Sequence, residues 1–141
     1  MPRSVKKLDR LLRVRTLQLD LVRADEVRAV AKVDQEAKLR DRIASLAANV
    51  APTPSASESA SSLAAAAHFR ERLHQSAFAA DKRVEVAEQS LEMARVATRE
   101  ARRDQNAIEK LITRAEADAA LKALRELEQL PPMGKNRHDI C

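Results

Sequence analysis

Apolar residues recur at alternating intervals of four and three along residues 73–119. The fourteen positions of this series are Leu73, Ala77, Ala80, Val84, Ala87, Leu91, Ala94, Thr98, Ala101, Gln105, Ile108, Ile112, Ala115 and Ala119. Twelve of the fourteen are apolar, and the residues beside them are mostly charged. A spacing that averages 3.5 residues is typical of a helix packed in a coiled coil. We therefore expect a long coiled-coil helix here.

A weaker series with the same spacing occurs earlier in the chain. It consists of Leu8, Leu12, Arg15, Leu19, Val22, Glu26, Ala29, Val33, Glu36, Arg40, Ile43 and Ala47, of which eight are apolar. Ser4 is a candidate N-cap, and Pro52 and Pro54 disfavour helix at the residues before them. The pattern predicts a first helix over residues 4–50.

The Pro- and Ser-rich segment 51–62 separates the two series and predicts a linker, with Ser61 or Ser62 capping a second helix over 63–130. Pro131 and Pro132 would end that helix and leave a disordered tail, 131–141. Because neither helix can hide its apolar series alone, we expect them to pack together. The predicted fold is all-α: a single antiparallel two-helix coiled-coil hairpin over residues 1–130, with a longer second helix.

The linker length suggests how the two helices align. Folding the chain at the centre of the linker places Val5 opposite Ile108 and leaves residues beyond about 110 without a partner from the first helix. This overhang carries leucines at every third position, namely Leu121, Leu124, Leu127 and Leu130. The shift in spacing indicates local overwinding or a change of partner.

Composition adds that the core is thin. Seven of the twelve apolar positions in the second series are alanine, and the chain has no Trp or Tyr, two Phe and one Gly. Alanine buries little apolar area, so we expect a hairpin of modest stability.

The net charge of +5 lies at one end of the chain. Residues 1–15 contain six basic side chains and one acidic side chain, whereas the remaining residues contain twenty of each sign. A basic end on a neutral chain indicates either a contact with an acidic or polar partner or a solvated helix face.

No residues form a recognisable catalytic constellation, cofactor site or metal site. His68 and His74 are six residues apart and so lie on different helix faces, and a chain with one Gly has no phosphate-binding loop. We expect no enzymatic activity and no cofactor. The longest apolar run is five residues, charged residues interrupt the N-terminus, and the lone Cys141 has no intrachain partner. These features favour a cytoplasmic protein without direct membrane insertion.

Both aromatic residues lie near the start of the second helix, outside its apolar series. Phe78 follows Ala77 on the outer side and should be largely exposed, whereas Phe69 borders the series. An exposed phenylalanine can anchor a partner, although single exposed apolar residues are common.

The segments VKKLDRLLRVRTLQLDLVRADEVRA and REARRDQNAIEKLITRAEADAALKALRELEQ resemble the two ends of the FliJ/YscO family, also called SctO. This resemblance implies a coiled-coil central stalk of a flagellar or virulence type III secretion apparatus. Its partners would be the hexameric export ATPase, the cytoplasmic domain of the export-gate membrane protein, and secretion chaperones. Unlike many members, this chain has no aromatic residue in its first helix.

The resemblance also implies residues for each contact. Contact with the ATPase ring would fall on Lys6, Lys7, Arg10, Arg13, Arg15, Glu109, Lys110, Leu111 and Arg114. Contact with the export gate would fall on Leu46, Phe69, Leu73 and Phe78.

Two other functions fit the same pattern. The chain could be a generic scaffold or adaptor that self-associates through the leucine overhang. It could also be a coiled coil that binds nucleic acid through its basic N-terminus, in which case binding would be strongly salt-dependent. The low net charge and the absence of an aromatic stacking platform disfavour nucleic acid.

Overall fold

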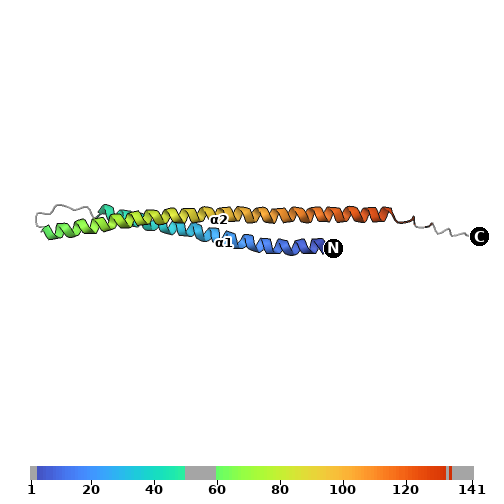
Figure 1. The fold of residues 1–141 in the computed structure, drawn as a ribbon, viewed down its shortest axis with the longest axis horizontal. Coiled ribbons are helices and arrows are strands. Elements are labelled where there is room, and N and C mark those ends of the chain that lie inside the picture. Colours follow the sequence, from blue (N-terminus) through green and yellow to red (C-terminus); the bar gives the residue numbers. More distant parts are fainter. Residues whose placement is uncertain (1–2, 50–59, 133, 135–141) are drawn as a thin grey trace, which may run out of the picture. The chain divides into compact units, whose positions relative to one another are not determined.

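The computed structural model describes residues 3–49, 60–132 and 134. These residues form two helices, α1 (Arg3–Asn49) and α2 (Ala60–Glu128), which are labelled in Figure 1. Helix is favoured throughout because Ala, Leu, Arg, Lys and Glu predominate and neither helix contains Gly or Pro. The all-α hairpin with a longer second helix is confirmed.

The helix bounds differ from the expected ones by one to three residues. Helix α1 begins at Arg3, so Ser4 lies inside the helix rather than at its cap, and Ser61 and Ser62 likewise lie in the first turn of α2. Most of the predicted linker and of the predicted tail lies outside the described residues. The end of α2 follows expectation: the backbone N–H of Leu130 donates to Leu127 O at 3.2 Å in a final turn before Pro131.

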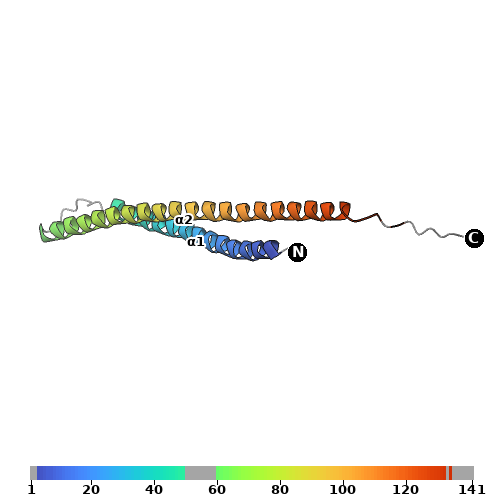
Figure 2. The same cartoon turned by 45° about the vertical axis from the view of Figure 1, so that its right-hand side comes forward.

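The chain divides into two compact units. The terminal unit comprises Met1–Leu17 with Arg103–Cys141, and the central unit comprises Gln18–Arg102. Within each unit a part of α1 packs against a part of α2, and the two helices run in opposite directions (Figures 1 and 2).

Both predicted series form the surfaces along which the helices pack. None of the fourteen positions in α2 or the twelve in α1 is exposed. In the central unit the buried apolar side chains are Leu19, Ala80, Val84, Ala87 and Leu91, and in the terminal unit they are Val5 and Ile108. The spacing of apolar residues therefore identified the packed face of each helix correctly.

The predicted alignment of the two helices was wrong by about one heptad. In the terminal unit Arg15 pairs with Asp104 and Thr16 with Gln105, which places Val5 level with Ala115 instead of Ile108. Val5 is only 1% exposed, and Ile112, Ala115 and Ala119 are half-buried. The stretch of α2 without an α1 partner therefore begins near Ala120, about ten residues later than expected.

In the central unit the pairing of Glu36 with Arg83 follows the same alignment. Asn49, the last residue of α1, is then level with a position about three turns into α2 rather than with the start of α2. The first residues of α2, from Ala60 to Phe69, extend past the end of α1, and all but Ala66 are exposed. The alignment was missed because a shift of one heptad leaves apolar residues facing apolar residues. The apolar pattern alone therefore does not distinguish the observed alignment from the predicted one.

Candidate functional site

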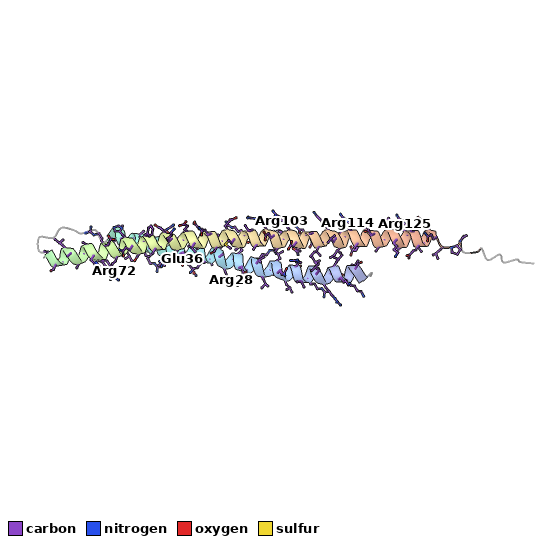
Figure 3. The ribbon with its side chains drawn as sticks, in the orientation of Figure 1. Arg28, Glu36, Arg72, Arg103, Arg114 and Arg125 are labelled. Atoms are coloured by element: carbon purple, nitrogen blue, oxygen red, sulfur yellow. The ribbon has the colours of Figure 1, made fainter. Side chains whose placement is uncertain are left out.

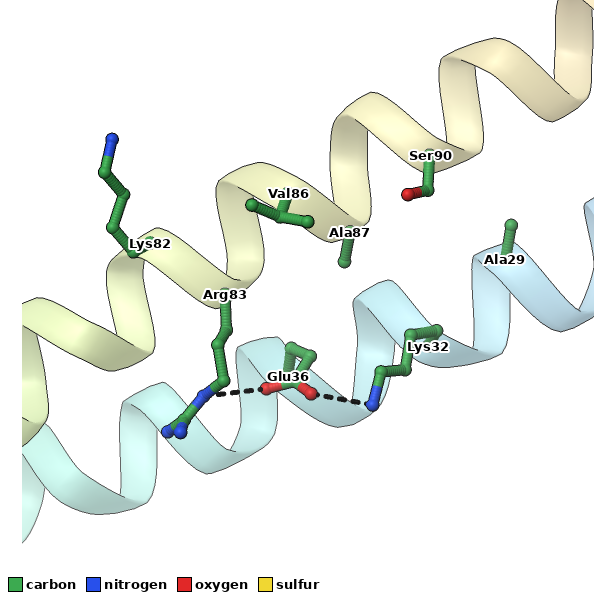
Figure 4. A pocket seen from close by; sticks show the side chains of 8 residues that line it. All are labelled: Ala29, Lys32, Glu36, Lys82, Arg83, Val86, Ala87 and Ser90. Carbon is green, nitrogen blue, oxygen red and sulfur yellow. Dashed lines mark ion pairs between the residues drawn. The ribbon is translucent and has the colours of Figure 1, made fainter.

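A charged cluster lies across the helices of the central unit. Glu36 is only 9% exposed, although it is ionisable and occupies a packed position of α1. Its Oε1 lies 2.9 Å from Lys32 Nζ on the same helix, and its Oε2 lies 3.4 Å from Arg83 Nε on α2 (Figure 4). The Arg83 contact is an ion pair without hydrogen-bond geometry, because Oε2 has no hydrogen-bond partner among the described residues.

These neighbours shift the ionisation of Glu36. The hydrogen bond from Lys32 lowers the pKa of the Glu36 carboxyl below its ordinary value of 4.5. Burial opposes this shift, and the positive charges of Lys32 and Arg83 add to it, so the pKa is lowered on balance. Glu36 therefore stays charged between the helices at neutral pH.

A shallow hollow of about 480 Å³ lies beside this cluster. Figure 4 shows the small side chains Ala29, Ala87 and Ser90 on one side of it and the ion-paired Glu36 on the other. Small residues at packed positions leave space between helices that larger side chains would fill. The hollow is therefore a consequence of the alanine-rich packing.

Polar contacts also cross the helices of the terminal unit. The Arg15 guanidinium donates from Nη1 to Asp104 Oδ2 at 3.1 Å, and Gln105 Nε2 donates to Thr16 Oγ1 at 3.2 Å. Both contacts involve positions where a coiled coil usually places apolar residues. Polar pairs at such positions define alignment, since a shifted helix would leave them without partners.

The basic residues proposed for ring contact on α1 differ in their exposure to solvent. Lys6, Lys7, Arg10 and Arg13 are exposed, whereas Arg15 is half-buried and engages Asp104. Next to Arg13 is a shallow hollow of about 430 Å³, lined by Leu12, Arg13, Thr16 and Leu17. Four exposed cations beside apolar surface are thus available to a partner, while Arg15 also supports the packing of the helices.

On α2, the structure brings three of the four proposed ring-contact residues together. Glu109, Lys110 and Arg114 line one groove of about 640 Å³ with Asn106, Thr113 and Ala117. Leu111 lies outside this groove and is 47% exposed. All four residues are level with α1, whereas Leu111 and Arg114 were expected in the overhang.

The residues proposed for gate contact do not form one patch. Phe69 and Phe78 are both exposed, but they are nine residues apart, which is two and a half helical turns, so they lie on opposite sides of α2. Leu46 is exposed on α1, and Leu73 is half-buried at a packed position. Phe78, at 71% exposure, is the residue of this group most available to a partner, as expected.

The leucines near the end of α2 lie on the surface. Leu121, Leu124, Leu127 and Leu130 are 53–63% exposed. Leu121 and Leu124 project from the side of α2 opposite Ala115 and Ala119, so the stripe does not continue the face that packs on α1. The terminal unit therefore carries exposed apolar and exposed basic side chains together.

Other sites are not apparent in the described part of the chain. Among those residues no group of three or more His, Cys, Asp or Glu side chains could hold a metal ion. Within the described residues, neither α1 nor α2 contains a segment that could span a membrane.

Sequence reasoning overlooked the contacts that Glu36, Glu26 and Arg15 make across the helices. The sequence did contain a sign of these contacts, because each of the three is a charged residue in a series of otherwise mostly apolar positions. Such residues require partners of opposite charge, which are Arg83, Arg95 and Asp104. Searching for those partners would have corrected the alignment of the helices.

Comparison of the chain with protein-family models, curated proteins and solved structures finds no match.

Proposed function

We propose that this chain is the central-stalk component of a type III secretion or flagellar export apparatus. In this proposal the terminal unit binds the ring of the hexameric export ATPase, and the central unit contacts the export gate. The protein would act in the cytoplasm, at the membrane-embedded secretion apparatus, and would perform no chemistry itself.

The observation that carries the proposal is the surface of the terminal unit. There Lys6, Lys7, Arg10 and Arg13 are exposed on α1, and leucines are exposed on α2. Exposed charges steer a partner and set its orientation, while apolar side chains supply most of the binding free energy. A surface of this kind suits insertion into a ring that offers both acidic and apolar groups.

The resemblance to FliJ/YscO proteins supports the same assignment, because family members join their two helix ends to the ATPase ring. In this chain the basic segment of α1 and the last turns of α2 belong to one unit. The α2 groove that holds Glu109, Lys110 and Arg114 adds a second charged surface to that unit.

Phe78 is the strongest candidate for the gate contact. Its ring is exposed on α2 in the central unit, whereas the residues assigned to the ATPase belong to the terminal unit. Burial of a phenylalanine side chain at a partner surface contributes about 1.5–3 kcal/mol, enough for one side chain to affect affinity measurably.

The test is ATP hydrolysis and hexamer formation by the export ATPase of the same organism, with and without this protein. We expect stimulated hydrolysis and more hexamer. The triple variant Lys6→Glu, Arg10→Glu, Arg13→Glu should bind about tenfold more weakly or worse, because it reverses three exposed charges. The effect should shrink as salt is added.

Phe78→Ala is the matched control, since it should leave ATPase stimulation unchanged while weakening capture of the gate domain. Circular dichroism should show equal helicity for both variants, because all four side chains are exposed. No stimulation by the wild-type protein at any concentration, or full stimulation by the triple variant, would contradict the proposed role.

A further inference from the structure

The last four turns of α2 carry an apolar face with charged side chains along it. These charges are complementary to those of a second copy of the same face. The face consists of Ala117, Leu121 and Leu124, which lie opposite the residues that pack on α1. All three are exposed, and Leu121 and Leu124 are each more than half exposed. An apolar helix face of this kind normally packs against another helix.

The charged residues along this face alternate in sign about Leu121. Arg114 and Asp118 precede it, and Arg125 and Glu128 follow it, so the order is basic, acidic, leucine, basic, acidic. Figure 3 shows Arg114 and Arg125 on the edge of α2 away from α1. All of these side chains are exposed.

When the helix direction is reversed, each basic position in this order becomes acidic and each acidic position becomes basic. If a second copy packs antiparallel with the two Leu121 side chains facing each other, Arg114 lies opposite Glu128 of the other copy. Asp118 then lies opposite Arg125, and two-fold symmetry repeats each pair. A parallel arrangement would instead bring like charges to the same level, Asp118 with Asp118 and Arg125 with Arg125, which is unfavourable.

From this pattern we propose that the apolar face around Leu121 is a self-association site, through which two copies of the chain pair antiparallel. The interface joins Leu121 and Leu124 of each copy at its centre and places the oppositely charged side chains at its edges. This inference does not depend on the proposed stalk function, because it requires only the terminal unit and a second copy of it.

The size of the face sets the strength of the dimer. Residues 114–128 span four turns, about 22 Å of helix, whereas stable interfaces bury about 1,200 Å² or more in total. We therefore expect a weak, reversible dimer with a Kd of about 10 to 100 µM.

The experiment is sedimentation equilibrium of the full chain from about 1 µM to about 1 mM, which spans that Kd. Wild-type protein should shift from monomer to dimer. Asp118→Arg and Arg125→Asp should each raise the Kd about tenfold, because each places two like-charged pairs across the interface. The double variant with both changes should recover the wild-type Kd, since the exchanged charges are complementary again.

Two further variants separate this interface from other causes. Leu121→Asp should abolish the dimer, whereas Leu46→Asp, at a leucine of the central unit that is 52% exposed against 53% for Leu121, should not. Helicity at 222 nm should be the same in all variants. A wild-type chain that stays monomeric throughout, or single charge reversals that the double variant does not rescue, would overturn the proposal.

Discussion

Glu36 illustrates how one residue can define the alignment of two helices. It sits among apolar neighbours where a leucine would bury more apolar area, yet it bridges Lys32 and Arg83. Shifted by one heptad, its carboxylate would lie near Ala77, with no basic side chain opposite, and the free energy of that buried charge would rise. The main effect of Glu36 is therefore to favour the observed alignment over the one shifted by a heptad. Its contribution to the stability of the folded chain is smaller.

The pH dependence of stability tests this role. Because the folded-state pKa of Glu36 is lowered, its stabilising contribution is present above its ordinary value of 4.5 and disappears as pH falls through the lower folded value. Glu36→Gln should lower Tm at pH 7, and the difference from wild type should vanish in acid. Thermal scans at a series of pH values measure this, with the exposed Glu88→Gln as a control that should change Tm little. A difference that persists in strong acid would exclude a role for the charge.

At the scale of the helix, the two sides of α1 differ sharply over two residues. Leu19 is 2% exposed against α2, whereas Leu21 is 67% exposed on the outer side. Helical geometry turns neighbouring positions away from each other, so only one of the two leucines is removed from water. The apolar pattern of the sequence distinguished them, because Leu19 belongs to the four-and-three series and Leu21 does not.

The two leucines give a matched pair of variants. Leu19→Ala should reduce the free energy of unfolding by about 2–5 kcal/mol, because it removes a buried side chain and leaves a cavity. Leu21→Ala should change it by less than about 0.5 kcal/mol. Urea denaturation followed at 222 nm measures both. Equal losses in the two variants would mean that α1 packs through a different face.

At the scale of the whole molecule, alanine supplies most of the apolar packed positions of α2 but few of those of α1. Seven of the twelve apolar packed positions of α2 are Ala, and in the part of the chain that the structure describes, both phenylalanines are exposed. Each alanine removes little apolar area from water, so packing contributes a small free energy per turn of helix. Polar contacts such as Arg15 with Asp104 provide specificity but little compensating stability.

We therefore expect a low, broad thermal unfolding transition. The breadth follows from a small enthalpy of unfolding and from helix ends that lack neighbours. Circular dichroism at 222 nm during heating measures the transition. A sharp transition above about 80 °C would show that the helices are stabilised by contacts other than those described here.

The two helices and the face that each uses for packing could be predicted from the sequence, because helix propensity and heptad spacing are local properties. All twenty-six expected packed positions lie in the interior or at its edge. It also indicated that Phe78 would be exposed. The residues assigned to partner contacts stay predictions, because the sequence of this chain describes only one side of each contact.

The alignment of the two helices, by contrast, became clear only from contacts between residues distant in sequence. Alignments one heptad apart bury nearly the same apolar surface, so the choice depends on pairs distant in sequence, such as Glu36 with Arg83. The same alignment carries Ile112, Ala115 and Ala119 under α1 and leaves Leu121 and Leu124 exposed on the other side of α2. Long-range charge pairing, which a local pattern does not contain, explains the alignment, whereas helical geometry turns Leu121 and Leu124 away from Ala115 and Ala119.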